Sequence, residues 1–151
     1  MRGRRQYGVA TLEMLLVLPV LLVFLAGLVF FGRYFTYYSM AQKAAHDGAR
    51  YLATVSRREM KTQLSGATQV PAMLLAQSIA QQEMAGLQAG PVAVVVECAP
   101  SPCTGWVLPE KVRVVVQMQV TDQLFAPFSD LFVGDQGLLL QADVSMLYVG
   151  Q

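Results

Sequence analysis

Few side chains in this chain of 151 residues could carry out acid–base or covalent chemistry: it holds one histidine and two cysteines. His46 stands beside Asp47 in a stretch of helical periodicity, and no nucleophile is paired with it. No glycine-rich phosphate loop and no carboxylate pair suited to glycoside cleavage is found either. The sequence therefore predicts a protein that is not an enzyme and that needs no cofactor or metal.

Cys98 and Cys103 enclose the short segment Ala-Pro-Ser-Pro. In an oxidising compartment this spacing is typical of a small disulfide loop, stiffened here by Pro100 and Pro102. A redox-active pair is more usually C-x-x-C, and a structural zinc site would need two further ligands. We therefore favour a structural disulfide in an exported domain.

One carboxylate, Glu13, heads a long apolar run. Met14 to Gly32 contains no charged residue, and as a helix rising about 1.5 Å per residue it nearly spans the hydrocarbon of a bilayer. Pro19 lies inside the run, where a proline kinks a membrane helix without forbidding it. Because an acid inside hydrocarbon is costly, the place of Glu13 calls for a physical reason.

The flanks of the run predict its orientation. Arg2, Arg4 and Arg5 precede it, which favours a cytoplasmic N-terminus and an exported C-terminal part. Arg33 follows it, together with aromatic residues suited to the far interface: Tyr34, Phe35, Tyr37 and Tyr38. An ordinary cleaved secretory signal is the alternative, but its apolar core is shorter and ends at small residues. The net charge of +1 gives no basic face for nucleic acid.

The helical pattern continues beyond the membrane run, and we expect one helix from about Thr11 to about Arg58. The inward positions recur at spacings of three and four, and they are Tyr38, Ala41, Ala45, Ala49, Leu52 and Ala53. Gly48 predicts either a close contact or a bend, since glycine is unfavourable within a helix. A second amphipathic helix is predicted to begin at Pro71 and to close at Gly90, with Leu74, Leu75, Ile79 and Met84 as candidate core residues.

Three later segments have the texture of strands. "VAVVVEC" is rich in β-branched residues, and "KVRVVVQMQVT" and "GLLLQADVSMLYV" alternate between apolar and polar positions. The first two are predicted to pair as a hairpin with the cysteine loop near its tip. Phe125, Phe128 and Phe132, between the last two, are expected to cover the core. The fold class is therefore α+β: a long N-terminal transmembrane helix, a second helix and an antiparallel sheet of about three strands.

The N-terminal residues resemble a class III signal, the type IV prepilin signal. A short basic leader ends in Gly8, and "VATLE" follows directly. In prepilins a peptidase cuts after the glycine, and a glutamate stands fifth in the mature chain. The resemblance implies a cut between Gly8 and Val9. It divides the chain into a leader of residues 1–8, a transmembrane and assembly helix of residues 9–32, and a pilin-like domain of residues 33–151.

A narrower resemblance covers roughly the first 55 residues. "GVATLEMLLVLPVLLVFLAGLVFFGR" and the later "AQKAAHDGARYLA" are similar to the TadE family, the TadE and TadF pseudopilins of the Tad/Flp pilus. That family has an acid, an internal proline, a Gly-Arg-like exit and a downstream Ala-Ala-x-x-x-Ala-Arg motif. The matching positions are Glu13, Pro19, Gly32, Arg33, Ala44, Ala45, Ala49 and Arg50.

The resemblance implies a minor pilin or pseudopilin in the bacterial inner membrane. Its expected partners are a prepilin peptidase, other pilins of the system, the assembly platform and the lipid bilayer, and not nucleic acid. Glu13, Pro19, Ala45, Ala49 and Arg50 are the expected assembly residues. An uncleaved, anchored periplasmic binding module is the alternative, and a tip adhesin with a patch around Trp106 is a third hypothesis. Against the third, we favour Trp106 packed on the sheet.

For Glu13 we hypothesise a pair with the amine that cleavage would free at Val9, on its own chain or a neighbour's. Such a pair would offset the cost of a carboxylate in a low-dielectric core. The alternative needs no partner: Glu13 would lie at the level of the headgroups, favoured by the positive end of the helix dipole.

Overall fold

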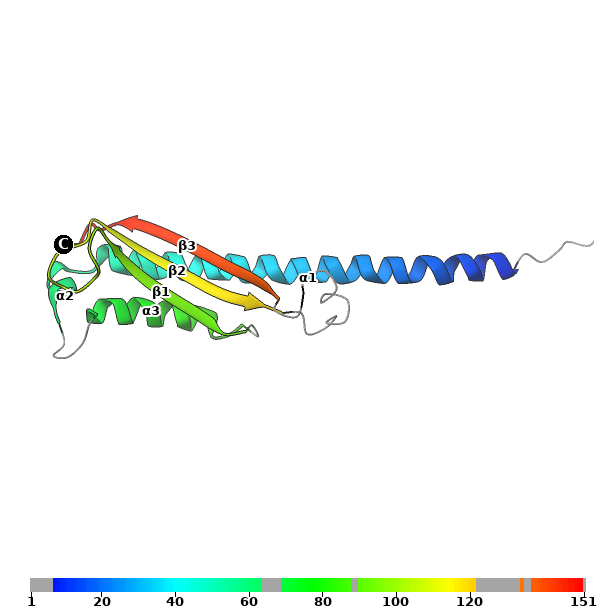
Figure 1. The fold of residues 1–151 in the computed structure, drawn as a ribbon, viewed down its shortest axis with the longest axis horizontal. Coiled ribbons are helices and arrows are strands. Elements are labelled where there is room, and N and C mark those ends of the chain that lie inside the picture. The colour runs from blue at the N-terminus through cyan, green and yellow to red at the C-terminus, as the bar shows by residue number, and fades with distance from the viewer. Residues whose placement is uncertain (1–6, 64–68, 88–89, 122–133, 135–136, 151) are drawn as a thin grey trace, which may run out of the picture.

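The computed structural model describes residues 7–63, 69–87, 90–121, 134 and 137–150, and side chains from Ala10 onward. Its elements are α1 (Tyr7–Thr54), α2 (Arg57–Lys61), α3 (Pro71–Met84), β1 (Val92–Ala99), β2 (Lys111–Val120) and β3 (Leu138–Leu147). Figure 1 shows α1 as one long rod, with the sheet and α3 packed along its C-terminal part. The α+β fold expected from the sequence is confirmed.

Helix α1 runs through Pro19 without a break and ends at Thr54, one turn earlier than expected. The expectation that one helix extends to Arg58 is wrong, because Ser56 starts a new helix. The Ser56 hydroxyl accepts a hydrogen bond from the Glu59 N–H, and the Glu59 carboxylate accepts one from the Ser56 N–H, both at 3.3 Å. This capping box fixes the start of α2 and so separates it from α1.

The sheet is antiparallel in the order β1-β2-β3, and β1 and β2 form the predicted hairpin. Val115 of β2 lies opposite Val95 of β1 and Asp143 of β3. The alternation predicted for β2 is confirmed, since its inward residues are all buried: Val112, Val114, Val116, Met118 and Val120. In β3, Leu140 and Ala142 are buried on the same side.

Small residues let α1 and α3 approach the sheet closely. A Cβ added at Gly48 would lie 3.3 Å from the Ala76 carbonyl oxygen and 3.5 Å from Val114 Cγ1. Of the two interpretations of Gly48, the close contact is therefore confirmed, at the point where α1, α3 and β2 meet. Lys43 Nζ adds an ion pair between the helices, 2.7 Å from the Glu83 carboxylate, which raises the pKa of Lys43.

The expected core of α3 is partly wrong. Met84 is buried and Ile79 is half-buried, but Leu74 and Leu75 are 51% and 48% exposed. The face that packs inward consists of smaller or more flexible residues: Ala72, Met73, Ala76, Ala80 and Met84. Alanine allows the close approach of α3 to Gly48, and the two leucines fall on the opposite side of the helix. Phe125, Phe128 and Phe132 lie outside the described residues.

The last described residues clasp the C-terminal end of α1. The Val149 N–H donates to the Ala53 carbonyl at 2.9 Å, and the Tyr148 hydroxyl donates to the Val55 carbonyl at 3.0 Å. Carbonyls at and beyond a helix C-terminus lack helical partners, so these bonds satisfy groups that would otherwise need water. The clasp fastens β3 to the end of α1.

Candidate membrane and assembly helix

The N-terminal half of α1 exposes a long apolar surface. The large side chains from Leu12 to Phe31 are nearly all exposed, with Phe30 as the buried exception, and the small Ala26 is buried as well. Within α1, a window of 18 residues reaches a mean hydropathy of 3.0. By length and composition this helix could cross a membrane, and it fits a single-pass anchor. A surface of this kind needs lipid or other apolar helices around it.

Glu13 lies in this half, near the start of α1, and its side chain is exposed. No hydrogen bond or ion pair joins it to another residue in the part of the chain that the structure describes. Val9 stands four residues earlier in the same helix, so the two positions share one helix face about one turn apart. A helical Cβ tilts toward the N-terminus, which directs the Glu13 side chain toward Val9.

At the C-terminal end of the apolar run, the space next to Gly32 is open. A Cβ at Gly32 would meet nothing within 4 Å, and its carbonyl accepts a hydrogen bond from the Thr36 hydroxyl at 2.9 Å. Arg33 is exposed next to it. The following aromatics divide into two groups: Tyr34 and Tyr37 pack against the core, whereas Phe35 and Tyr38 face outward.

The downstream alanines lie in a different environment. Ala44, Ala45 and Ala49 have no exposed surface and belong to the core that α1 forms with α3 and the sheet. Arg50 is exposed. Any effect of Ala45 or Ala49 on assembly must therefore act through the domain they hold together, since neither has surface to offer a neighbour.

Comparison with known families gives a match over residues 8–50, to TadE-like proteins. This segment is TadE-like. The match begins at Gly8, takes in the apolar run with Glu13 and Pro19, and ends at Arg50, inside the domain. The match points to a protein related to the Tad pilus, and the TadE-like family is a structural family of that pilus. Neither the curated proteins nor the solved structures gave a match to the chain.

Beyond the TadE-like segment, the cysteine loop is fixed at several points. Cys98 and Cys103 form a disulfide with their Cα atoms 5.3 Å apart. Gln63 Nε2 donates a hydrogen bond to the Thr104 carbonyl. Gly105 has φ +84°, and a Cβ there would lie 3.1 Å from side-chain atoms of Gln63 and Val70. Glycine is therefore required by both conformation and space.

Trp106 follows this glycine and is 80% exposed. The interpretation that it packs on the sheet is therefore wrong. Cys103 and Pro109 are buried on either side of it in sequence, so the loop is anchored at both ends while its middle turns outward. Val107 is exposed as well. The adhesin hypothesis requires an exposed apolar or aromatic patch around Trp106, and Trp106 and Val107 are two exposed residues of that kind.

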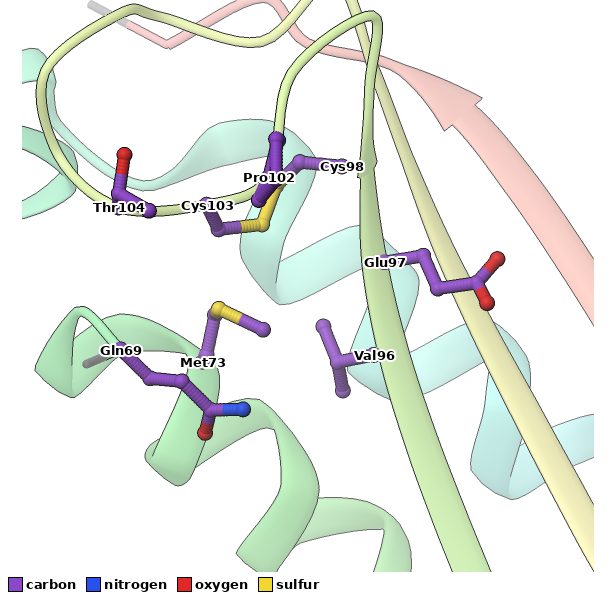
Figure 2. Close-up of a pocket in the computed structure, with 8 residues that line it drawn as sticks. All are labelled: Gln69, Met73, Val96, Glu97, Cys98, Pro102, Cys103 and Thr104. Carbon is purple, nitrogen blue, oxygen red and sulfur yellow. A yellow bond between two sulfur atoms is a disulfide. The ribbon is translucent and has the colours of Figure 1, made fainter.

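A hollow of about 580 Å³ lies between the cysteine loop, α3 and β1. Figure 2 shows Met73 of α3 and Val96 of β1 directed toward one another, with the disulfide above them. Glu97 points away from the hollow and pairs with Arg113 at 3.0 Å. The hollow is therefore lined mainly by apolar and sulfur-bearing groups. No signal in the sequence identified it, because it depends on how three segments distant in sequence pack together.

Proposed function

We propose that this protein is a minor pilin or pseudopilin of a Tad/Flp pilus, acting in pilus assembly or initiation and so in surface attachment. The observation that supports the proposal most is the TadE-like half-helix with no cover of its own, headed by Glu13. Such a surface suits a subunit that exchanges lipid for neighbouring helices as it assembles.

In this proposal a prepilin peptidase cuts between Gly8 and Val9, removing residues 1–8 and keeping residues 9–32 as the assembly helix. The cut would turn the Val9 amide nitrogen into an ammonium group one helical turn from Glu13. In a filament core a lone carboxylate costs several kcal/mol, on the order expected for a buried ion, whereas a paired one is tolerated. The pair forms within one chain or between neighbours.

The proposal also sets orientation and compartment. The three arginines of the leader favour a cytoplasmic N-terminus, so residues 33–151 would be periplasmic, and extracellular once the subunit enters a pilus. The partners are then the peptidase, the other pilins, the inner-membrane platform and the bilayer.

The test is complementation of a strain that lacks this gene and carries the rest of the system. We expect the unaltered protein to restore surface pili, and Glu13→Ala to be processed and membrane-bound yet to restore few. Glu110→Ala is the matched control, since it removes an exposed acid from the domain and should restore pili fully. Pili are measured in the sheared surface fraction, and processing is measured by the change in protein mass.

Two results would contradict the proposal at different points. Normal piliation with Glu13→Ala would rule out a required pair between Glu13 and the Val9 amine, but it would not contradict the pilin function. Normal piliation in the deletion strain would remove the assembly function itself. The uncleaved, anchored binding module would then be the better account.

A further inference from the structure

β1 is an edge strand, and the hydrogen bonds of the sheet determine which of its peptide groups face outward. The Tyr148 N–H donates to the Glu110 carbonyl at 2.9 Å. Within β2, even-numbered residues therefore direct their peptide groups to β3 and odd-numbered residues direct theirs to β1. Glu110 itself, just before the strand, bonds to both sides, since its N–H donates to the Ala99 carbonyl at 2.9 Å. In register, odd residues of β2 oppose odd residues of β1, as Val115 opposes Val95. The even residues of β1 must then direct their N–H and C=O groups away from the sheet.

A contact from α3 agrees with this assignment. Gln77 Nε2 donates a hydrogen bond of 2.6 Å to the carbonyl of Val94, an even residue of β1. The side chain of Gln77 thus satisfies one outward acceptor. Among the described residues, no hydrogen bond reaches the outward peptide groups of the next two even residues, Val96 and Cys98.

The unsatisfied stretch lies beside the hollow. Val96 and Cys98 both line it, opposite Met73 of α3. Figure 2 shows the Val96 and Met73 side chains on two sides of the space and the disulfide on a third. A residue in a strand added beside β1 would direct its inward side chain toward this space, because inward positions on neighbouring strands share a face.

We propose that the edge of β1 from Val96 to Cys98, together with the hollow, binds an extended segment of a partner protein as a fourth strand. Outward N–H and C=O groups on alternate residues, repeating every ~7 Å, match another extended backbone. The hollow would hold one apolar side chain of that segment, since a charged one would lose its water without a partner.

Charge adds a further condition on the partner segment. Its neighbouring residues would lie on the outer face of the sheet beside Val95 and Glu97, which are exposed. A basic residue there would face the Glu97 carboxylate, which also has Arg113 of β2 as a partner at 3.0 Å. At the other edge of the sheet, Val149, just beyond the end of β3, already donates its N–H to Ala53 of α1. This site is independent of cleavage at Gly8 and of any pilus function.

The probe is a blocked peptide of seven residues, threonine-valine-lysine-leucine-lysine-valine-threonine, whose central leucine would enter the hollow. The full chain in detergent micelles is titrated with labelled peptide, and amide hydrogen exchange is measured residue by residue. We expect saturable binding and slower exchange at Val96 and Cys98. A peptide N-methylated on the amides that face β1, and one with aspartate for leucine, should bind at least tenfold more weakly.

The matched protein variants are Val96→Pro and Val96→Thr. Proline removes the outward N–H while leaving the bonds between β1 and β2, so it should weaken binding at least tenfold. Threonine keeps the N–H and should bind as well as the unaltered chain. Lack of saturable binding, equal binding of the N-methylated peptide, or protection elsewhere than Val96 and Cys98 would overturn the proposal. The peptide variants decide the matter even where Val96→Pro fails to fold.

Discussion

The two halves of α1 belong to one continuous helix but have opposite surroundings. From Leu12 to Phe31 large apolar side chains face outward, and a Cβ at Gly27 would meet nothing within 4 Å. From Ala41 to Ala53 the inward side chains are small and buried, and a Cβ at Gly48 would press on Ala76. We call Leu12–Phe31, the candidate membrane span, the inner half of α1, and Ala41–Ala53 the outer half. The outer half finds its partners within the chain, and the inner half must find them elsewhere.

This difference separates two kinds of sequence requirement. In the outer half, residue size is set by the fit to α3 and β2, so a change acts on folding. In the inner half most side chains other than Ala26 and Phe30 are exposed, so a change there acts mainly on what surrounds the helix. Because the helix is continuous, a force applied to the inner half is transmitted directly to the domain.

A matched pair of glycine substitutions, one in each half of α1, should give the largest effect and tests this difference directly. Gly48→Leu should destabilise the domain by about 3 kcal/mol, since α3 and β2 leave no room for the side chain. Gly27→Leu should leave domain stability unchanged. Urea unfolding in micelles measures both, and equal effects at the two positions would contradict the division of α1.

The next largest effect concerns the loop at the far end of the domain. Replacing Cys98 and Cys103 together by alanine should lower stability by about 2 kcal/mol, because the disulfide closes only a short loop. The loss should appear in the domain's urea midpoint and not in membrane insertion of the inner half. An unchanged midpoint under oxidising conditions would show that the disulfide contributes nothing.

A smaller effect on stability is expected at the C-terminal end of the outer half, where β3 is bonded to α1. Tyr148→Phe removes the hydrogen bond to the Val55 carbonyl and should cost about 1 kcal/mol. Burial raises the pKa of Tyr148, in keeping with its hydroxyl lying in the clasp. Tyr38→Phe is the control, because the hydroxyl of Tyr38 is in an exposed bond with Gln42. Equal thermal stability of both variants would mean that the clasp does not hold α1.

The smallest effect depends on pH. Arg113 bonds to Asp143 and lowers the pKa of that carboxyl below its usual value. The stabilisation of the folded state by this ion pair is therefore complete above a pH of about 4, and it is lost as the pH falls through the folded pKa of Asp143. Exposure keeps the contribution small.

Asp143→Asn should accordingly lower the urea midpoint slightly at pH 7, and the difference should shrink as the pH falls through the folded pKa of Asp143 and its carboxyl becomes protonated. Glu13→Gln, in the inner half, should leave the midpoint unchanged over the same pH range. A difference for Asp143→Asn that grows on acidification would contradict the assigned ion pair.

Sequence periodicity predicted correctly those elements that have the same surroundings from end to end. The alternation in β2 placed Val112 and Val116 correctly, and the apolar run before Arg33 gave the span. In α3 it failed at Leu74 and Leu75, because helix spacing alone does not tell a leucine stripe from a neighbouring alanine face. The signal S-x-x-E at Ser56 could have shown the end of α1 in advance.

Other features depend on contacts between distant residues and were beyond prediction. The hydrogen bond from Tyr148 to Val55 joins positions 93 residues apart. The hollow at Val96 is lined by residues from α3, β1 and the cysteine loop, which are distant in sequence. In the candidate site, sequence indicated Glu13, its spacing from Gly8 and the inward face that holds Ala45 and Ala49, whereas the elements that cover these alanines needed the fold.

The N-terminus of the membrane-extracted protein tests the central claim most directly. Intact mass and N-terminal sequencing, from cells that carry the prepilin peptidase, should find a chain that begins at Val9. Gly8→Leu should keep the leader, and Gly8→Ala should be processed in part. A chain that retains the leader in those cells, or one that begins beyond Gly32, would contradict the account of Glu13 and of the half-helix it heads.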